Sequence, residues 1–298
     1  MKTDRPSATA LLIARATVFL ARDPRWGQLV PPLAAEASRE FLEASSPRAK
    51  RFLAIVEKDW LRKSVAVAEW LTIPGIVLHY AVRKRFLEQV ARRSLATGTR
   101  QVVVLGAGFD TLVWRLQREF PETNFLELDH PATQAVKRKA LEKRIGSADN
   151  LALCSVDLTE PGWDERVAAR RVLKSETATL FIAEGLLMYL TESQVASIFR
   201  FVHASGAGPR PFAFTFMETK PGKAVDFANA RFTARLWLRL RGEPFRWGIQ
   251  REQLPEFLAA HGFSLRELAD AETFRRDYLN GADVPLTTGE CVCVAEAR

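Results

Sequence analysis

The chain has few of the residues from which disulfide frameworks and metal centres are built. Three cysteines and four histidines occur in 298 residues. So few thiols favour a reducing compartment over a disulfide framework, and the histidines are scattered, with no H-x-x-x-H or C-x-x-C near them. Cys291 and Cys293 form a C-x-C, which places both thiols on one face of a strand and is typical of ordinary buried cysteines. We therefore expect no metal site and no disulfides.

Long apolar runs are also missing. The most apolar N-terminal stretch, Ala8–Leu20, is interrupted by Arg15 and leads into charged residues instead of a small-residue cleavage site. Its apolar residues recur at helical spacing, so we interpret it as an amphipathic helix and not as a signal peptide. No stretch approaches the roughly 18–20 apolar residues of a transmembrane helix. The sequence predicts a cytoplasmic protein without a membrane partner.

The charge is strongly basic, with a net charge of +8 and a pI of about 9.7. Such a balance is compatible with an acidic substrate, with nucleic acid or with an anionic membrane surface. However, acidic residues interleave with most of the basic clusters, and neither a dense basic tail nor an aromatic RNA-binding motif occurs. Solvated helix faces therefore explain the clusters best. We expect no nucleic-acid partner, keep an acidic small-molecule substrate open, and find no indication of the oligomeric state.

Periodicity divides the chain near residue 97. The first hundred residues have apolar residues at three- and four-residue steps, which predicts helices over Leu33–Leu42, Phe52–Leu61 and Ile76–Leu95. Short apolar runs then alternate with helical stretches, the pattern of a parallel sheet built from βαβ units. The predicted strands are Gln101–Leu105, Thr123–Leu128, Leu151–Val156, Ala178–Ala183, Pro211–Met217, Phe263–Leu268 and Glu290–Ala295. The predicted helices between them are Thr111–Phe120, Ala132–Ile145, Trp163–Leu173, Glu192–His203 and Glu252–Ala260.

The segment after the fifth strand predicts a basic helix over Val225–Arg241. Arg231, Arg235 and Arg239 stand at four-residue steps and would form one cationic ridge. The ridge is either part of a lid that receives an acidic substrate or a solvated face opposite apolar residues, and the second interpretation is favoured. The connection Thr273–Thr288 is expected to be long and partly irregular.

A glycine-containing turn follows the first buried strand. Leu105-Gly106-Ala107-Gly108-Phe109-Asp110 has glycines where a strand must turn sharply into a helix. Glycine lets such a turn close and lets a ligand lie against the backbone. The motif alone is a weak signal, but its place between a strand and a helix is the one that a nucleotide-binding turn requires.

Acidic residues follow the next three strands, at Asp129, Asp157 and Glu184. Ligands of open α/β sheets bind at the carboxyl ends of the strands, and a carboxylate after the second strand suits the two hydroxyls of a ribose. Asp157 lies where the amino group of an adenine could be recognised, although an Asp at such a junction also caps helices. Together these residues indicate a ligand that contains adenosine.

The residues after the glycines favour S-adenosylmethionine over NAD. The dinucleotide fingerprint requires a third glycine at position 111, where this chain has Thr111. The preceding Asp110 would repel a pyrophosphate but tolerates a ligand that carries an ammonium and a sulfonium. For Asp110 itself we favour a turn or capping role with an indirect effect on the ligand.

The blocks LGAGFDT (105–111), FLELDHP (125–131), VDL (156–158) and AEGLLMYL (183–190) resemble the leucine carboxyl methyltransferase family. The likeness is greatest to its bacterial S-adenosyl-L-methionine-dependent O-methyltransferases and runs from about residue 80 to 220. It implies an α/β class I methyltransferase fold, with a Rossmann-like seven-stranded sheet whose last strand is antiparallel and helices on both faces. It also implies a helical N-terminal cap over 1–97, a cofactor-binding core over 98–298 and a helical lid at about 222–242.

The resemblance implies a role for each matched residue. Arg83 falls on the position that binds the methionyl carboxylate, with Arg85 as the fallback, and Glu88 on the position of the family's usual acid. Gly106 and Gly108 would meet the methionyl part of S-adenosyl-L-methionine, Asp129 the ribose, Asp157 with Leu158 the adenine, and Glu184 the amino-acid or sulfonium end. A carboxylate acceptor needs no general base because it is ionised at pH 7, so no catalytic residue is assigned.

The predicted activity is methylation of a carboxylate or hydroxyl oxygen on a small, polyketide-like molecule, with S-adenosyl-L-homocysteine as the product and no metal. The alternatives are a protein C-terminal carboxyl methyltransferase, a tRNA-modifying relative, an NAD(P)-dependent oxidoreductase and a non-catalytic binding protein on the same fold.

Overall fold

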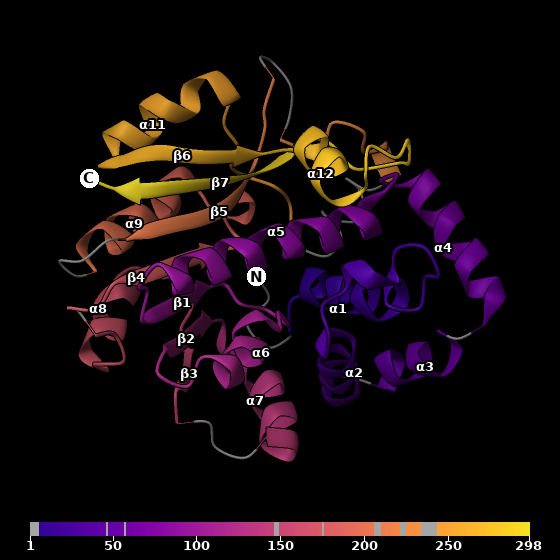
Figure 1. The fold of residues 1–298 in the computed structure, drawn as a ribbon, viewed down its shortest axis with the longest axis horizontal. Helices are drawn as coiled ribbons and strands as arrows, with labels where there is room; N and C mark the ends of the chain where they lie inside the picture. Colours follow the sequence, from indigo (N-terminus) through magenta and orange to yellow (C-terminus); the bar gives the residue numbers. More distant parts are fainter. Residues whose placement is uncertain are drawn as a thin grey trace.

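The computed structural model describes residues 6–45, 47–56, 58–145, 149–174, 176–205, 210–220, 225–233 and 243–298. Its centre is a seven-stranded sheet in the order β3-β2-β1-β4-β5-β7-β6. β7 runs antiparallel to both of its neighbours, β5 and β6, whereas β1 to β5 pair in parallel. Figure 1 shows this sheet with helices on both sides. The predicted α/β fold with an antiparallel last strand is confirmed.

The strands are β1 (Gln101–Leu105), β2 (Asn124–Asp129), β3 (Leu151–Ser155), β4 (Thr179–Ala183), β5 (Pro211–Met217), β6 (Phe263–Ala269) and β7 (Glu290–Ala297). The α-helices are α1 (Ala8–Leu20), α2 (Ala34–Ser45), α3 (Pro47–Ile55), α4 (Asp59–Leu71), α5 (Ile76–Ala96), α6 (Leu112–Glu119), α7 (Pro131–Ile145), α8 (Trp163–Ala169), α9 (Glu192–Ala204), α11 (Leu254–Ala260) and α12 (Ala271–Tyr278). Short 3-10 helices are η1 (Gly27–Leu29), η2 (Leu187–Tyr189) and η3 (Arg251–Gln253). The predicted strand bounds agree with these to within two residues.

The centre of the sheet is buried on both faces. Every residue of β1 and of β4 is buried, as their continuously apolar sequences require. Helices α5, α6 and α12 pack on one face, and α8, α9 and α11 pack on the other. The predicted boundary near residue 97 falls just after α5, which itself lies on the sheet.

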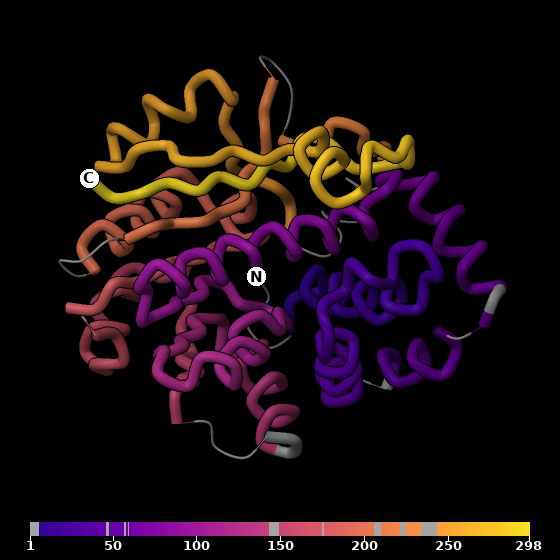
Figure 2. The backbone as a smooth tube through the Cα atoms, viewed as in Figure 1, coloured from indigo at the N-terminus to yellow at the C-terminus, as the bar shows by residue number. Residues whose placement is uncertain are grey.

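Helices α1 to α4 form a separate layer beside the sheet. α1, α2 and α3 share an apolar cluster with α7 that includes the buried residues Phe41 and Leu42. Figure 2 shows these N-terminal helices, in indigo, grouped at one side of the strands, with α4 as an outlying arm that leads back to α5. This layer covers the edge at which the parallel strands end.

Two predicted helices are wrong in part. The helix predicted over Phe52–Leu61 is interrupted, because Lys58 N–H bonds back to the carbonyl of Ile55 and closes a tight turn between α3 and α4. The lid helix predicted from Val225 does not begin there. Its backbone N–H groups donate to distant carbonyls and not to carbonyls one helical turn earlier. Ala228 N–H donates to the carbonyl of Thr288, and Arg231 N–H donates to the carbonyl of Thr72. Among the described lid residues only 232–233 are helical, and Arg235 and Arg239 lie outside the described part of the chain.

Helix α12 was not predicted, because the stretch from Thr273 onward was interpreted as irregular. Its N-terminal signal is Asp270, whose side chain accepts hydrogen bonds from the backbone of Glu272 and Thr273, the arrangement of a helix N-cap. The remainder of the connection, before β7, has no helix or strand, as expected.

Cys291 and Cys293 are free and buried on β7, which confirms their interpretation as core thiols. Over the described residues, no single helix has the length and apolarity needed to cross a membrane. The pair α4–α5, bent by 89° between its two helices, meets that criterion of length and composition when both are counted together.

Candidate active site

The glycine turn and the second strand are tied together by Asp129. Its Oδ2 accepts a hydrogen bond from Gly108 N–H at 2.7 Å, and its Oδ1 accepts one from His130 N–H at 2.7 Å. Gly106 and Gly108 both have positive φ, +66° and +51°, and a Cβ on Gly106 would lie 2.8 Å from Leu186. The turn therefore needs glycine at these positions, and the carboxylate of Asp129 is fixed beside it.

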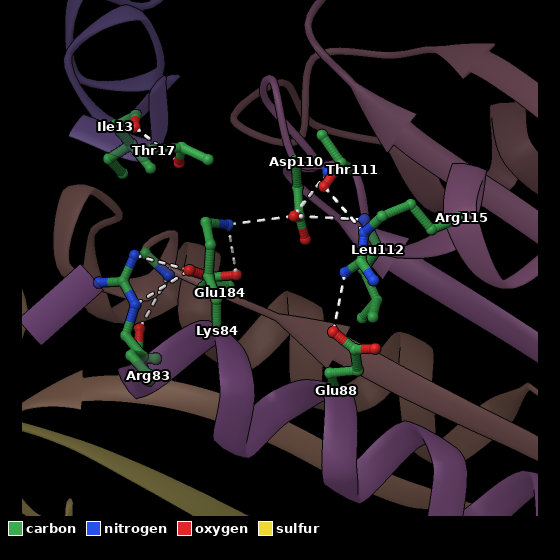
Figure 3. Close-up of polar contacts among 12 residues, drawn as sticks. Ile13, Thr17, Arg83, Lys84, Glu88, Asp110, Thr111, Leu112, Arg115 and Glu184 are labelled. Atoms are coloured by element: carbon green, nitrogen blue, oxygen red, sulfur yellow. Dashed lines mark hydrogen bonds and ion pairs between the residues drawn. The ribbon is translucent and has the colours of Figure 1, made fainter. Parts of the chain in front are cut away.

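A row of alternating charges lines the floor of the site. Arg83 Nη1 donates to both carboxylate oxygens of Glu290, at 2.7 and 2.8 Å, while its Nε and Nη2 donate to Glu184 Oε1 at 3.0 and 2.7 Å. Lys84 Nζ lies 3.0 Å from both Glu184 Oε2 and Asp110 Oδ1. Figure 3 shows the Lys84 ammonium between these two carboxylates. The row of Glu290, Arg83, Glu184, Lys84 and Asp110 contains three acids and two bases, so it carries one negative charge in excess.

The pKa values follow from these contacts. Burial by itself would raise the pKa of Asp110, but Lys84 and Lys137 lower it to about 2. Burial likewise opposes ionisation of Glu290, but Arg83 and His79 lower its pKa to about 2. For Lys84, burial is outweighed by Asp110 and its other carboxylate neighbour, and its pKa is raised. These three groups are therefore charged at pH 7.

Asp157 lies at the opposite end of the same edge. Its Oδ1 accepts hydrogen bonds from the N–H and hydroxyl of Thr159, at 2.9 and 2.6 Å, and its Oδ2 lies 3.6 Å from His130 Nε2. One oxygen thus stabilises a local turn, which resembles the capping role that was the alternative for this residue. Asp157 also lines a cavity of about 190 Å³ together with Leu158 and Asp129.

Three cavities meet at this edge of the sheet. The loop cleft, of about 110 Å³, is lined by Gly106, Gly108 and Glu184, and the Asp157 cleft is the cavity of about 190 Å³ described above. The third, the helical chamber, has about 410 Å³ between α1, α4 and α5. Tyr189 lines all three. Its position marks the junction between a polar cleft that follows the strand ends and a larger chamber under the N-terminal helices.

The start of α1 closes over the two clefts. Ser7 lines both, and the buried carboxylate of Glu243 accepts hydrogen bonds from the N–H groups of Ala8 and Thr9, at 3.0 and 3.1 Å. A carboxylate at a helix N-terminus is favoured by the helix dipole. Glu243 thereby holds α1 to the segment that precedes β6.

The structure brings all seven predicted site residues to this edge. Gly106, Gly108, Asp129 and Glu184 line the loop cleft together with Arg83, and Asp157 and Leu158 line the neighbouring cleft. Arg85 does not line these cavities; it is one-third exposed and lies 3.9 Å from Glu88. Glu88 is buried and binds Arg115 at 3.0 Å, so it holds α6 to α5 instead of facing a ligand.

Sequence reasoning missed Lys84 and Glu290. Lys84 stands in the triplet Arg83-Lys84-Arg85, which looks like a solvated basic face. Glu290 is the first residue of β7, 207 positions from the arginine that it binds, and no local pattern connects them. In the described residues, no group of three or more His, Cys, Asp or Glu side chains is arranged to hold a metal ion.

The comparisons with known proteins concern the family and the fold of the chain. The family model for leucine carboxyl methyltransferase matches residues 15–203. A relative from Mycobacteroides abscessus, named as a candidate S-adenosyl-L-methionine-dependent methyltransferase, is 26% identical over 296 residues, which cover 90% of this chain and 93% of the relative. A similarly named relative from Frankia alni is 34% identical over 145 residues, 47% of this chain and 48% of its own length, so the match spans about half of that protein.

Two solved structures overlap this chain at low identity. The magnesium protoporphyrin IX methyltransferase of Synechocystis PCC 6803 has a TM-score of 0.46 at 11% identity, covering 74% of this chain and 85% of that one. The pyocyanin biosynthetic protein PhzM has a TM-score of 0.46 at 14% identity, covering 91% and 76%.

The sheet order, the glycine turn and the acidic strand ends define a class I S-adenosyl-L-methionine-dependent methyltransferase. The chain belongs to the leucine carboxyl methyltransferase family. This family assignment does not support the alternative of an NAD(P)-dependent oxidoreductase.

Proposed function

We propose that the protein is an O-methyltransferase that transfers the methyl group of S-adenosyl-L-methionine to a carboxylate or hydroxyl oxygen of a small molecule. The observation that carries the proposal is the junction at Tyr189, where the cleft at the strand ends shares its wall with a chamber of about 410 Å³. That volume lies within the range of cavities that bind small molecules.

The residues at the strand ends fit the methyl donor. The row of charges beside the loop cleft has one excess negative charge, and the amino-acid and sulfonium part of S-adenosyl-L-methionine carries one net positive charge. Positive φ at the glycines lets the backbone approach a ligand closely. The proposed binding residues are Arg83, Gly106, Gly108, Asp129, Asp157, Leu158 and Glu184, to which the charge row adds Lys84.

When bound, S-adenosyl-L-methionine supplies a methyl group on a positively charged sulfur, which an oxygen nucleophile displaces in line. The protein's own contribution is alignment and exclusion of water. Burial raises the pKa of both Tyr80 and Tyr189, so these phenols stay protonated and serve as hydrogen-bond donors or walls instead of bases. Neither phenol therefore takes up the proton that a hydroxyl acceptor releases.

A thermal-shift comparison tests the cofactor. S-Adenosyl-L-homocysteine at about 100 times its Kd should add about 2.7 kcal/mol of stability, and NAD and NADP should add none. A stabilisation by NAD alone would contradict the proposed function.

The transfer itself is tested with methyl-labelled S-adenosyl-L-methionine. The acceptors are a panel of small phenols and carboxylic acids, and a peptide with a free C-terminal carboxylate. We expect label in the small molecules. Label in the peptide alone would establish the protein carboxyl methyltransferase alternative.

A further inference from the structure

The helical chamber is walled mainly by apolar side chains from separate parts of the chain. Ile13 and Ala16 of α1, Val65 of α4, and Ile76 and Val77 of α5 form its aliphatic side. When a ligand buries apolar surface against such a wall, the gain in free energy is about 25 cal/mol per Å². A ligand whose groups are strongly hydrated gains little binding free energy from such a wall.

Part of the chamber wall is aromatic. Phe245 packs against both Tyr189 and Phe227, with ring centroids 5.4 and 5.6 Å apart, and all three rings line the chamber, as does Tyr80. Ring faces and edges of this kind favour a flat, unsaturated ligand through stacked and edge-to-face contacts.

The charged groups of the chamber do not favour an anion. At the inner end Arg83 is flanked by Glu184 and Glu290, so its charge is already balanced by two carboxylates. On α4, Glu69 lines the chamber and accepts a hydrogen bond from the N–H of Val77 on α5 at 2.9 Å. Arg15 also lines it, with its guanidinium 5.8 Å from the ring of Phe52. An acidic ligand would meet the carboxylate of Glu69 as well as the guanidinium of Arg15, and at the inner end it would meet an arginine that already binds two carboxylates. The chamber thus offers no excess of positive charge, and burying a carboxylate without a compensating charge is costly.

We propose that the helical chamber binds an uncharged, flat and lipophilic small molecule that presents a hydroxyl oxygen at the junction beside Tyr189. The inference rests on the proposed O-methyltransferase function and narrows its acceptor from a carboxylate or hydroxyl to a hydroxyl. It differs from the acidic substrate that the basic composition left open, because Arg83 at the inner end of the chamber is already paired with two carboxylates.

The test compares 2-naphthol with 2-naphthoate, which share one ring system and differ in charge at pH 7. Their Kd values are measured by calorimetry with the protein saturated by S-adenosyl-L-homocysteine. We expect 2-naphthol to bind at least about tenfold more tightly, a difference of about 1.4 kcal/mol. Equal or tighter binding of 2-naphthoate, or binding of neither probe, would overturn the proposal.

Two variants of α4 locate the probe. Ala68 lines the chamber and Ala66 does not, although both are exposed alanines of one helix. Ala68→Phe should weaken 2-naphthol binding by about tenfold or more, and Ala66→Phe should leave it unchanged. Normal binding by Ala68→Phe would show that the probe lies elsewhere and refute the assignment.

A third variant tests the charge argument. Glu69→Gln keeps an oxygen for the Val77 N–H and removes the negative charge, so it should narrow the gap between the two probes. An unchanged gap would contradict the role of Glu69. The Kd of S-adenosyl-L-homocysteine should be the same in all variants. If the native protein binds 2-naphthol but transfers no methyl group, the proposed function is wrong. If it methylates small molecules but does not bind 2-naphthol, the proposed ligand of the chamber is wrong.

Discussion

The pair formed by Glu290 and Arg83 allows a quantitative prediction. The side chain of Glu290 is fully buried, accepts two hydrogen bonds from Arg83 and lies 2.8 Å from His79 Nε2. Replacing it by Gln leaves the buried guanidinium with one carboxylate instead of two. Removing one member of a buried pair costs about 3–5 kcal/mol. The pKa of Glu290, lowered from 4.5 to about 2, corresponds to about 3 kcal/mol by itself.

We therefore expect Glu290→Gln to lose about 3 kcal/mol of unfolding free energy at pH 7, measured by urea denaturation. Because the folded-state pKa lies below the unfolded one, this stabilisation is complete above pH 4.5 and is lost as the pH falls toward 2. The difference between the native protein and the variant should thus be equal at pH 7 and 5 and smaller at pH 3.

Glu267→Gln is the matched control. Glu267 pairs with Arg93 at 2.6 Å, but the two side chains are 38% and 58% exposed, and such surface pairs contribute about 0–1 kcal/mol. A loss below about 1 kcal/mol in Glu290→Gln would refute the reasoning about the buried pair. A loss that stays constant down to pH 3 would refute the assignment of the titration to Glu290.

Three further predictions concern the site. Lys84→Met should weaken S-adenosyl-L-homocysteine binding by about tenfold or more, because a hydrogen bond to a charged group is worth about 1.5–3 kcal/mol; calorimetry checks this, with Arg85→Met as the unaffected control. Asp129→Ala should abolish cofactor binding while the circular dichroism spectrum stays native, and an unchanged Kd would show that the ribose is placed wrongly. The rate of hydroxyl methylation should rise with pH up to the acceptor's own pKa, since Tyr80 and Tyr189 stay protonated. For two acceptors of different pKa the midpoint should move with the acceptor, and a fixed midpoint would indicate a protein base.

The strands, and the residues that lie at their ends, could be predicted from local patterns in the sequence. Strands such as Gln101–Leu105 and Pro211–Met217 were predicted with the bounds observed, because an apolar run that is buried on both faces is a local pattern. The glycine turn and the acids after the strands are equally local. Parallel strands then bring these residues to one edge of the sheet in any βαβ arrangement.

Which charges meet at this edge, and which side chains enclose the chamber, depends on long-range contacts that no local pattern shows. Arg83 binds carboxylates 101 and 207 positions away, and Lys84 differs from a solvated lysine only through the residues that surround it. The lid prediction failed at Val225 because distant carbonyls, such as that of Thr288, take the N–H groups that a helix would use. The chamber is lined by helices and loops that each have an ordinary apolar face. Its shape and its balance of charge therefore depend on how these segments pack together in the folded protein.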